Sequence, residues 1–173
     1  MIRFFDIIIS LLGLLVLSPL FIIIFLIIII DSKGGGFYLQ SRVGLNNIDF
    51  KLIKFRSMKL NSDKGSLITI GSIDSRITGL GVLIRKFILD ELPQLINVFL
   101  GQMSFVGPRP EVRKYVDLYT NEQLLVLSVR PGITDYASII FADENKILGE
   151  SENPEKMYIE EIMPQKIALN MKY

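Results

Sequence analysis

The stretch of sequence that decides the fold is residues 7–30, IIISLLGLLVLSPLFIIIFLIIII, which contains no charged side chain. A straight helix of this length would reach about 36 Å, at roughly 1.5 Å per residue, and the hydrocarbon core of a bilayer is about 30 Å thick. The run is too long for the apolar region of a signal peptide, and no A-x-A-like cleavage site follows it. We therefore expect this segment to stay in the protein and anchor it to a membrane.

Ser18-Pro19 lies in the middle of the anchor, where proline removes a backbone donor and clashes with the preceding turn. The freed carbonyl needs a partner, which Ser10 or Ser18 can supply. Two interpretations follow: a kinked helix that spans the bilayer, or a helix–break–helix hairpin that enters and leaves one leaflet. The pattern alone favours the spanning helix. Arg3 precedes the segment and five basic residues follow it within residues 33–56, which predicts a cytoplasmic globular part.

The composition of the chain excludes several kinds of chemistry. Its 19 basic and 18 acidic residues give a net charge of +1, which offers no support for nucleic-acid binding. It has neither Cys nor His, which excludes disulfides, thiolate catalysis, Ser-His triads and His or Cys metal sites. Phosphoryl transfer fits what remains, because carboxylates, Lys, Arg and a hard cation such as Mg²⁺ can perform it.

The 173 residues predict one globular domain besides the anchor. Apolar and polar residues alternate in residues 37–43 and 49–55, with Asn46-Asn47 between them, which predicts a β-hairpin. Residues 59–79 are rich in Ser, Asp, Gly and Lys and are predicted to form a long loop.

A helical period starts at Leu80, and Pro93 favours two helices that meet near Leu89, because a helix tolerates proline in its first turn but not in its interior. Asp90 is then predicted at the N-cap or in the first turn of the second helix. Two further helices are predicted at residues 113–128 and 154–173. The expected fold class is α+β, mostly helical.

Asp90 and Glu91 are the candidate catalytic residues. Neighbouring side chains point about 100° apart on a helix, so these two would serve different partners and not share a proton. A helix N-terminus would keep Asp90 ionised, and an ionised carboxylate can bind Mg²⁺ or attack phosphorus. Taken alone, the pair is better explained as an acidic first turn that caps a helix.

Arg109 is the main candidate for binding an anion, because two prolines fix the backbone on either side of it. Arginine suits bidentate contacts with phosphate, although a rigid turn with an exposed arginine explains the pattern equally well. Arg130 precedes a second rigid turn, Pro131-Gly132. Lys54 and Arg56 lie on one face of the second predicted strand, where surface charge is an equal explanation.

Together these residues, from Ile2 to about Tyr173, resemble the bacterial sugar transferase family of small monotopic phosphoglycosyl transferases. The resemblance rests on the anchor with Ser18-Pro19 and on four further motifs, in order: QSRVG, KFRSM, LDELPQLINVFLGQMSFVGPRP and VRPGIT. Chance would not assemble all of them in this order.

The resemblance implies a fold that the pattern did not favour: a re-entrant membrane hairpin broken at Ser18-Pro19. Residues 1–33 would then form the anchor and residues 34–173 the catalytic domain. This domain would lie on the cytoplasmic face of the bacterial inner membrane, with amphipathic helices partly embedded in the lipid bilayer.

The resemblance also implies an activity. Asp90 would be the nucleophile and the Mg²⁺ ligand, attacking the β-phosphate of a UDP-sugar to release UMP and form a covalent sugar-phosphate intermediate. Polyprenyl phosphate would then attack this intermediate, assisted by Glu91. Lys54, Arg85, Arg109 and Arg130 match the basic positions expected around the diphosphate. A second copy of the chain, in a homodimer, is among the candidate partners.

The sequence departs from the family pattern at several positions. Phe87-Ile88-Leu89 replaces a frequent Ser or Thr, so the second helix lacks the expected cap residue. Asp135-Tyr136-Ala137-Ser138 stands where Gly-Trp-Ala-Gln is common, and Asn170 stands where an Asp is expected. These changes leave the identity of the sugar open. The chain ends at Tyr173, earlier than expected, which indicates a truncated or short member.

Two other functions compete with this one. A membrane glycosyltransferase would move the sugar alone and release UDP, and the Asp90-Glu91 pair followed by Pro93 argues against it. A scaffold that kept the fold without activity is the other. The intact Asp90-Glu91 pair and the retained Lys54, Arg85 and Arg109 argue against that.

Overall fold

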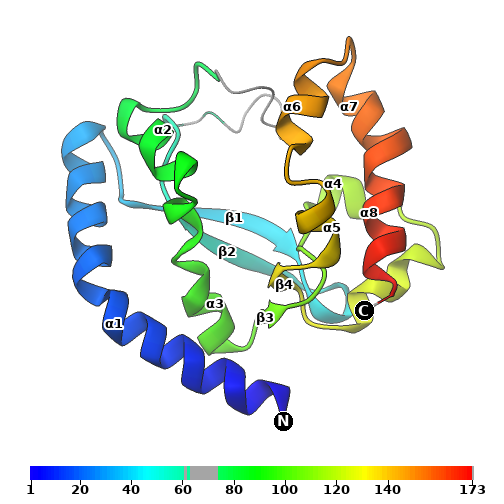
Figure 1. Cartoon of the computed structure of the whole chain (residues 1–173), viewed down its shortest axis with the longest axis horizontal. Coiled ribbons are helices and arrows are strands. Elements are labelled where there is room, and N and C mark those ends of the chain that lie inside the picture. The colour runs from blue at the N-terminus through cyan, green and yellow to red at the C-terminus, as the bar shows by residue number, and fades with distance from the viewer. Residues whose placement is uncertain (61, 63–73, 173) are drawn as a thin grey trace. The chain divides into compact units, whose positions relative to one another are not determined.

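The structure is a computed structural model that describes residues 1–60, 62 and 74–172 (Figure 1). Its elements group into two compact units, which we describe separately. Among the described residues, the first unit comprises 1–40, 51–60, 62 and 75–101, and the second comprises 41–50, 74 and 102–172. Most of the loop predicted at 59–79 lies outside the described residues.

The first unit begins with a single long helix, α1 (Ile2–Asp31), and not with the two helices of the predicted hairpin. Pro19 lies inside it, and Figure 1 shows the helix bending part-way along its length. Pro19 has no N–H for the Leu15 carbonyl, but the Ser18 hydroxyl donates to that carbonyl at 2.8 Å. This bond explains how the helix continues through the proline.

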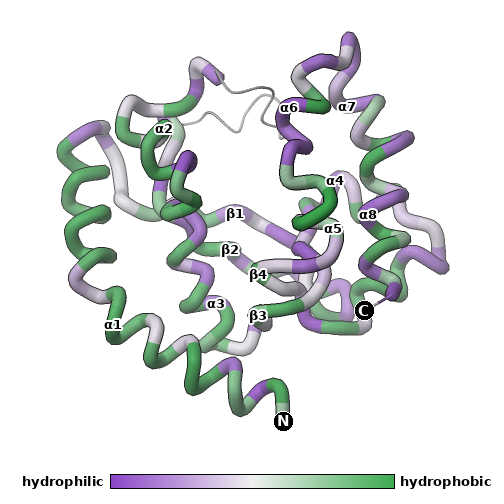
Figure 2. The backbone as a smooth tube through the Cα atoms, in the orientation of Figure 1, coloured by the Kyte–Doolittle hydropathy of each residue, from purple (hydrophilic) through white to green (hydrophobic). Residues whose placement is uncertain are grey.

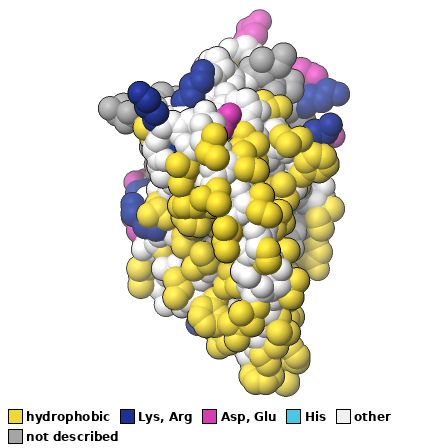
Figure 3. Space-filling view, turned by 90° about the vertical axis from the view of Figure 1, so that its left-hand side faces the viewer, with side chains coloured by type: hydrophobic (Ala, Val, Ile, Leu, Met, Phe, Trp, Pro, Cys, Tyr) yellow, Lys and Arg dark blue, Asp and Glu magenta, His cyan; other side chains and the backbone are white. Residues whose placement is uncertain are grey.

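Helix α1 is the one helix in the described residues that is long and apolar enough to cross a membrane, judged by length and composition. Figure 2 shows its hydrophobic character along most of its length. Only four of its residues are buried: Asp6, Ser10, Ile24 and Ile28. Hydrophobic side chains gather on the face of the molecule that Figure 3 shows. Most of α1 therefore presents apolar side chains outward.

Both ends of α1 are bound to the rest of the first unit. Near its start, the Arg3 guanidinium donates to the carbonyls of Val98 and Phe99, the latter at 2.7 Å. At its end, the Arg56 guanidinium donates to the Ser32 carbonyl at 2.8 Å. Arg56 is therefore a buried cap of α1, and surface charge, which the sequence left as an equal explanation, does not apply to it.

The other elements of the first unit follow the sequence prediction closely. Strands β1 (Phe37–Val43) and β2 (Asp49–Phe55) form the expected hairpin, with positive φ angles at the intervening Asn46 and Asn47. Helix α2 (Gly79–Lys86) starts at Thr78, whose hydroxyl accepts from the Gly81 N–H. Helix α3 (Gln94–Leu100) ends at Gly101, which has a left-handed conformation. The core is formed by Ile24, Ile28, Phe55 and Ile84.

The second unit contains residues 41–50, which form the turn end of the hairpin, and the described residues after Gly101. Strands β3 (Ser104–Val106) and β4 (Gly132–Thr134) form a parallel pair in which Ser104 lies opposite Gly132. Five short helices complete the unit: α4 (Arg113–Val116), α5 (Tyr136–Ile140), α6 (Glu144–Gly149), α7 (Pro154–Met157) and α8 (Met163–Asn170). A π-helical turn, Tyr158–Ile162, joins α7 to α8.

The predicted C-terminal helix is confirmed over residues 154–170, but the helix predicted at 113–128 is wrong. Helix α4 ends after one turn, and a 3₁₀ helix follows at Gln123–Ser128. The Thr120 hydroxyl accepts from the Gln123 N–H at 3.2 Å, and the Gln123 side chain accepts from the Thr120 N–H at 2.9 Å. This reciprocal cap starts a new helical segment and divides the predicted helix.

Candidate active site

The two candidate catalytic carboxylates lie in the first unit, between α2 and α3. Asp90 and Glu91 belong to a 3₁₀ turn, Leu89–Glu91, which follows Ile88 in a left-handed conformation. Helix α3 has Pro93 at its N-cap and no side-chain cap, as the missing Ser or Thr predicted. Asp90 is therefore not the N-cap of α3, because Leu92 and Pro93 separate the turn from the helix.

The Asp90 carboxyl is buried, with 9% of the residue exposed. Burial raises the pKa of Asp90 above its usual value and Glu91 adds to this effect, whereas the positive charges of Lys54 and Arg85 oppose it. The net direction is opposite to the one that a helix N-terminus alone would produce, because burial outweighs the groups that lower the pKa of Asp90. The same interactions show that the four residues predicted in this part of the chain share one electrostatic environment.

Lys54 and Glu91 form an ion pair with 2.9 Å between Nζ and Oε1, and both side chains are mostly buried. Lys54 lies on β2, so the pair connects this strand to the turn that carries Asp90. This contact joins residues 37 positions apart, so Lys54 is held beside the turn and is not an open surface charge.

Asn97 is a site residue that the sequence reasoning missed. It lies on α3 and is fully buried. Its Oδ1 accepts from the Ile53 N–H at 2.9 Å, and its Nδ2 donates to the Lys51 carbonyl at 2.8 Å. Both partners lie on β2, so this amide fixes the strand that carries Lys54 against α3. The available signal was a polar residue within the apolar run of α3.

Gln94 is a second buried polar residue that the sequence reasoning passed over. It is 1% exposed and lies in the first turn of α3, four positions after Asp90. Within the described residues, its Nε2 has no hydrogen-bond partner. A buried donor of this kind is costly unless a bound group satisfies it.

The residues present fit Mg²⁺ only if the substrate supplies part of the coordination. No three acidic residues in the described part of the chain lie together as a metal site. Magnesium, however, commonly binds one or two carboxylates together with substrate phosphates and water. Asp90 satisfies that requirement, while Glu91 is paired with Lys54.

Arg109 and Arg130 lie in the second unit, where β3 and β4 run side by side. The Gly107 N–H donates to the Thr134 carbonyl at 3.1 Å, and the Gly132 N–H donates to the Pro108 carbonyl at 3.0 Å. A side chain at Gly132 would place its Cβ 2.2 Å from the Gly107 nitrogen, so this close approach requires glycine. The Arg130 carbonyl also lies against Gly107. The structure thus brings the two arginine-bearing segments together.

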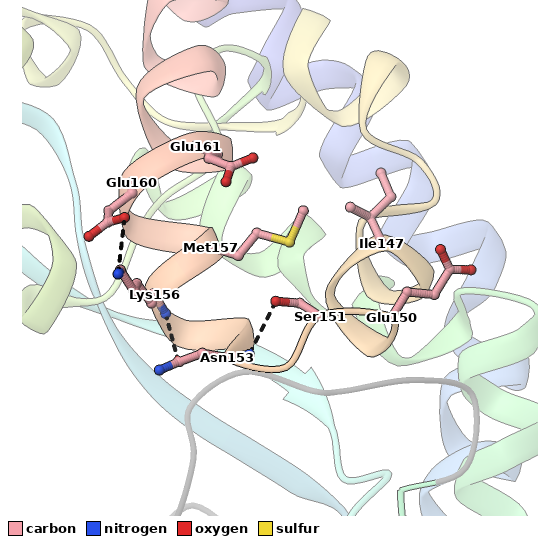
Figure 4. Close-up of a pocket in the computed structure, with 8 residues that line it drawn as sticks. All are labelled: Ile147, Glu150, Ser151, Asn153, Lys156, Met157, Glu160 and Glu161. Carbon is pink, nitrogen blue, oxygen red and sulfur yellow. Dashed lines mark hydrogen bonds and ion pairs between the residues drawn. The ribbon is translucent and has the colours of Figure 1, made fainter.

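The second unit also contains a surface hollow of about 510 Å³ (Figure 4). The described residues that line it are Ile147, Glu150, Ser151, Asn153, Lys156, Met157, Glu160 and Glu161. None of them was predicted to act on the substrate. Three carboxylates and one ammonium group disfavour a diphosphate there.

Comparison with known proteins identifies the family of this chain. A family model described as bacterial sugar transferase matches residues 1–173. The UDP-N-acetylgalactosamine-undecaprenyl-phosphate N-acetylgalactosaminephosphotransferase of Aeromonas hydrophila is 39% identical over 153 residues, which cover 84% of this chain and 36% of the relative. The UDP-glucose:undecaprenyl-phosphate glucose-1-phosphate transferase of Klebsiella pneumoniae is 38% identical over 158 residues, which cover 90% and 33%.

A third relative is the exopolysaccharide production protein ExoY of Sinorhizobium fredii, which is 38% identical over 147 residues covering 76% of this chain and 65% of the relative. This chain belongs to the bacterial sugar transferase family. It spans about a third of the length of the Aeromonas and Klebsiella relatives.

Proposed function

We propose that this protein transfers a sugar 1-phosphate from a UDP-sugar to polyprenyl phosphate and releases UMP, as the first membrane step in the assembly of a bacterial glycan. The observation that carries the proposal is the buried Asp90 beside the Lys54–Glu91 ion pair, in a chain that the family model matches from end to end. The Aeromonas and Klebsiella relatives named above are transferases of sugar phosphates to undecaprenyl phosphate, which supports the same reaction here.

In the first step, an Asp90 carboxylate oxygen attacks the β-phosphorus of the UDP-sugar. A bond forms between this oxygen and phosphorus, the bond from phosphorus to the bridging oxygen breaks, and its electron pair leaves with UMP. A carboxylate whose pKa is raised by burial is weakly solvated and therefore well suited to attack. Lys54 and Arg85 supply positive charge next to it.

In the second step, a phosphate oxygen of polyprenyl phosphate attacks the same phosphorus and displaces Asp90. The product is a polyprenyl diphosphate sugar, and the Asp90 carboxylate is restored. Glu91 assists through Lys54, and their ion pair supports this role because both charges act on Asp90. Arg109 and Arg130 are assigned to the diphosphate by the sequence resemblance.

Asp90 and the phosphates of the substrate would hold Mg²⁺, which supplies neutralisation of the phosphate charge. Removal of divalent cations with EDTA is therefore expected to abolish UMP release, and added Mg²⁺ to restore it. Activity that persists in EDTA would contradict the cofactor assignment alone.

We further propose that α1 enters and leaves the cytoplasmic leaflet without crossing the membrane. Its two ends both bind the same compact unit, through Arg3 and Arg56, which supports a helix with both ends on one side. The chain has no Cys, so single cysteines at Ile2 and Lys33 can be labelled selectively. Labelling of both positions from the cytoplasmic side is expected, whereas labelling from opposite sides would show a spanning helix.

The reaction itself is tested by product analysis. Purified protein is incubated with Mg²⁺, undecaprenyl phosphate and a panel of UDP-sugars, and the nucleotide product is identified. UMP release that depends on the lipid is the expected result and also identifies the sugar. UDP release would show a glycosyltransferase, and the absence of both products across the panel would favour a scaffold.

A further inference from the structure

Asp135 is a buried carboxylate in the second unit that the proposed reaction does not use. Only 6% of it is exposed, and it accepts hydrogen bonds from three separate segments. Its Oδ1 accepts from the Ser138 N–H at 2.5 Å, at the start of α5. Its Oδ2 accepts from the Arg109 N–H at 2.9 Å and from Asn170 Nδ2, on α8, at 2.7 Å.

The bond to Arg109 continues the pairing of β3 and β4 beyond the end of both strands. The Gly107 N–H reaches a backbone carbonyl, that of Thr134. Pro108 has no N–H, and the next donor along the chain, Arg109, reaches the Asp135 side chain instead. The Arg109 guanidinium also donates from Nη1 to the Ile133 carbonyl oxygen, at 3.4 Å. Asp135 therefore fixes the backbone from which the Arg109 side chain extends.

The three bonds require an ionised carboxylate. Burial alone would raise the pKa of Asp135, but hydrogen bonds from Ser138, Arg109 and Asn170 outweigh it, so the pKa lies below its usual value. An ionised carboxylate only accepts hydrogen bonds, whereas an asparagine at this position would turn an N–H₂ group toward one set of donors. Substitution by Asn therefore preserves shape but breaks at least one bond.

Asn170 depends on the same contact. It is buried, and its Nδ2 donates to Asp135. Within the described residues its Oδ1 has no hydrogen-bond partner, so the bond to Asp135 is what holds this amide in place. Asp135 and Asn170 are also two positions at which this sequence departs from the family pattern. The structure shows that these departures meet in one hydrogen bond.

We infer that Asp135 is a positioning residue for Arg109, and that Asn170 couples this carboxylate to the last helix, α8. The inference rests on the proposed function in one respect, the role of Arg109 as a ligand of the nucleotide diphosphate. Asp135 acts through the Arg109 backbone and does not itself touch the substrate.

The test is a double-mutant cycle on the binding of UDP, which carries the diphosphate without the sugar. Asp135→Asn is expected to raise the Kd for UDP and the KM for the UDP-sugar about tenfold, with a smaller change in kcat. In an Arg109→Ala background, Asp135→Asn should cause no further change. Additive effects of the two substitutions would overturn the inference, because Asp135 would then act independently of Arg109.

Asn153→Ala is the matched control, because Asn153 caps α7 in the same unit by accepting from the Lys156 N–H at 3.1 Å. It should lower thermal stability without changing the Kd for UDP. If Asp135→Asn does not fold, Asn170→Ala removes one bond of the three and should raise the Kd about two- to threefold. An unchanged Kd in that variant would contradict the coupling to α8.

Failure of this inference can be told apart from failure of the proposed function. If the wild-type protein neither binds UDP nor releases UMP, both the proposed function and this inference are contradicted. If the wild-type protein binds UDP and releases UMP, but the double-mutant cycle shows no coupling between Asp135 and Arg109, the inference alone is contradicted.

Discussion

Asp90 in the first unit and Asp135 in the second are both buried carboxylates, yet their surroundings shift their pKa values in opposite directions. Burial dominates at Asp90 and raises the pKa, whereas hydrogen bonds from three neighbours outweigh burial at Asp135 and lower it. A carboxylate with few compensating donors remains reactive toward phosphorus, and a fully hydrogen-bonded one is inert and structural. The comparison therefore separates the aspartate that we propose as catalytic from the one that we propose as a positioning residue.

Replacing aspartate by asparagine should have opposite effects on stability at Asp90 and at Asp135. Asp90→Asn is expected to reduce UMP release about a thousandfold or more, because the amide cannot act as the nucleophile. Its thermal stability should equal or exceed that of the wild type, since the ionised Asp90 carboxyl costs stability as the pH rises through its raised folded pKa. Differential scanning fluorimetry and nucleotide analysis measure the two effects. Substantial unfolding of this variant would contradict the comparison.

Lys54 tests how the charge beside Asp90 is balanced. Lys54→Gln removes a positive charge that lowers the pKa of Asp90, so the acidic limb of the kcat/KM profile should move to higher pH. Activity near neutral pH should fall about tenfold. Lys51→Gln is the control, because Lys51 lies exposed on the same strand. Equal shifts in both variants would show a general charge effect and not a specific one.

Asn97 tests how strand β2, which carries Lys54, is held against α3. Asn97→Ala leaves the Ile53 N–H and the Lys51 carbonyl without their partner and should cost about 2–4 kcal/mol of folding free energy. Chemical denaturation of the detergent-solubilised protein measures this loss. A loss below about 0.5 kcal/mol would show that water replaces the amide and that Asn97 does not fix β2.

The smallest expected effect concerns the pH dependence of stability at Asp135. The ionised carboxyl stabilises the fold above the usual aspartate pKa of about 3.9, and this contribution is lost as the pH falls through the lowered folded pKa. Asp135→Asn should therefore lower stability by about 1–2 kcal/mol at neutral pH, and the difference from the wild type should shrink on acidification. A difference that does not vary with pH would contradict an ionised Asp135.

Local features of the fold could be predicted from the sequence because they depend on neighbouring residues. Alternation located β1 and β2, and helical periodicity located α2 and α3. The division of the helix predicted at 113–128 also had a local signal, the spacing of Thr120 and Gln123, which the prediction did not use. The continuity of α1 also had a local signal, because the Ser18 hydroxyl binds the carbonyl that Pro19 leaves free, and the pattern alone favoured one helix. The family resemblance led the prediction to a hairpin instead.

The environment of the site could not be predicted in the same way. The pairing of Lys54 with Glu91 and the amide bonds of Asn97 join residues 37 to 46 positions apart. The burial of Asp90 likewise depends on how the chain folds around it. No pattern in a single sequence reports such contacts. Asp135 had a partial signal, since an aspartate before a short helical run is a common N-cap, but its bonds to Arg109 and Asn170 require the fold.

The central claim is that Asp90 becomes covalently bound to the sugar phosphate. The most direct test is mass spectrometry of the protein after incubation with Mg²⁺ and the UDP-sugar, without polyprenyl phosphate. We expect an added mass of one sugar phosphate on the peptide that contains Asp90. This mass should be lost on addition of polyprenyl phosphate and should be missing from Asp90→Asn. A label on another residue, or lipid-dependent turnover by Asp90→Asn at the wild-type rate, would contradict it.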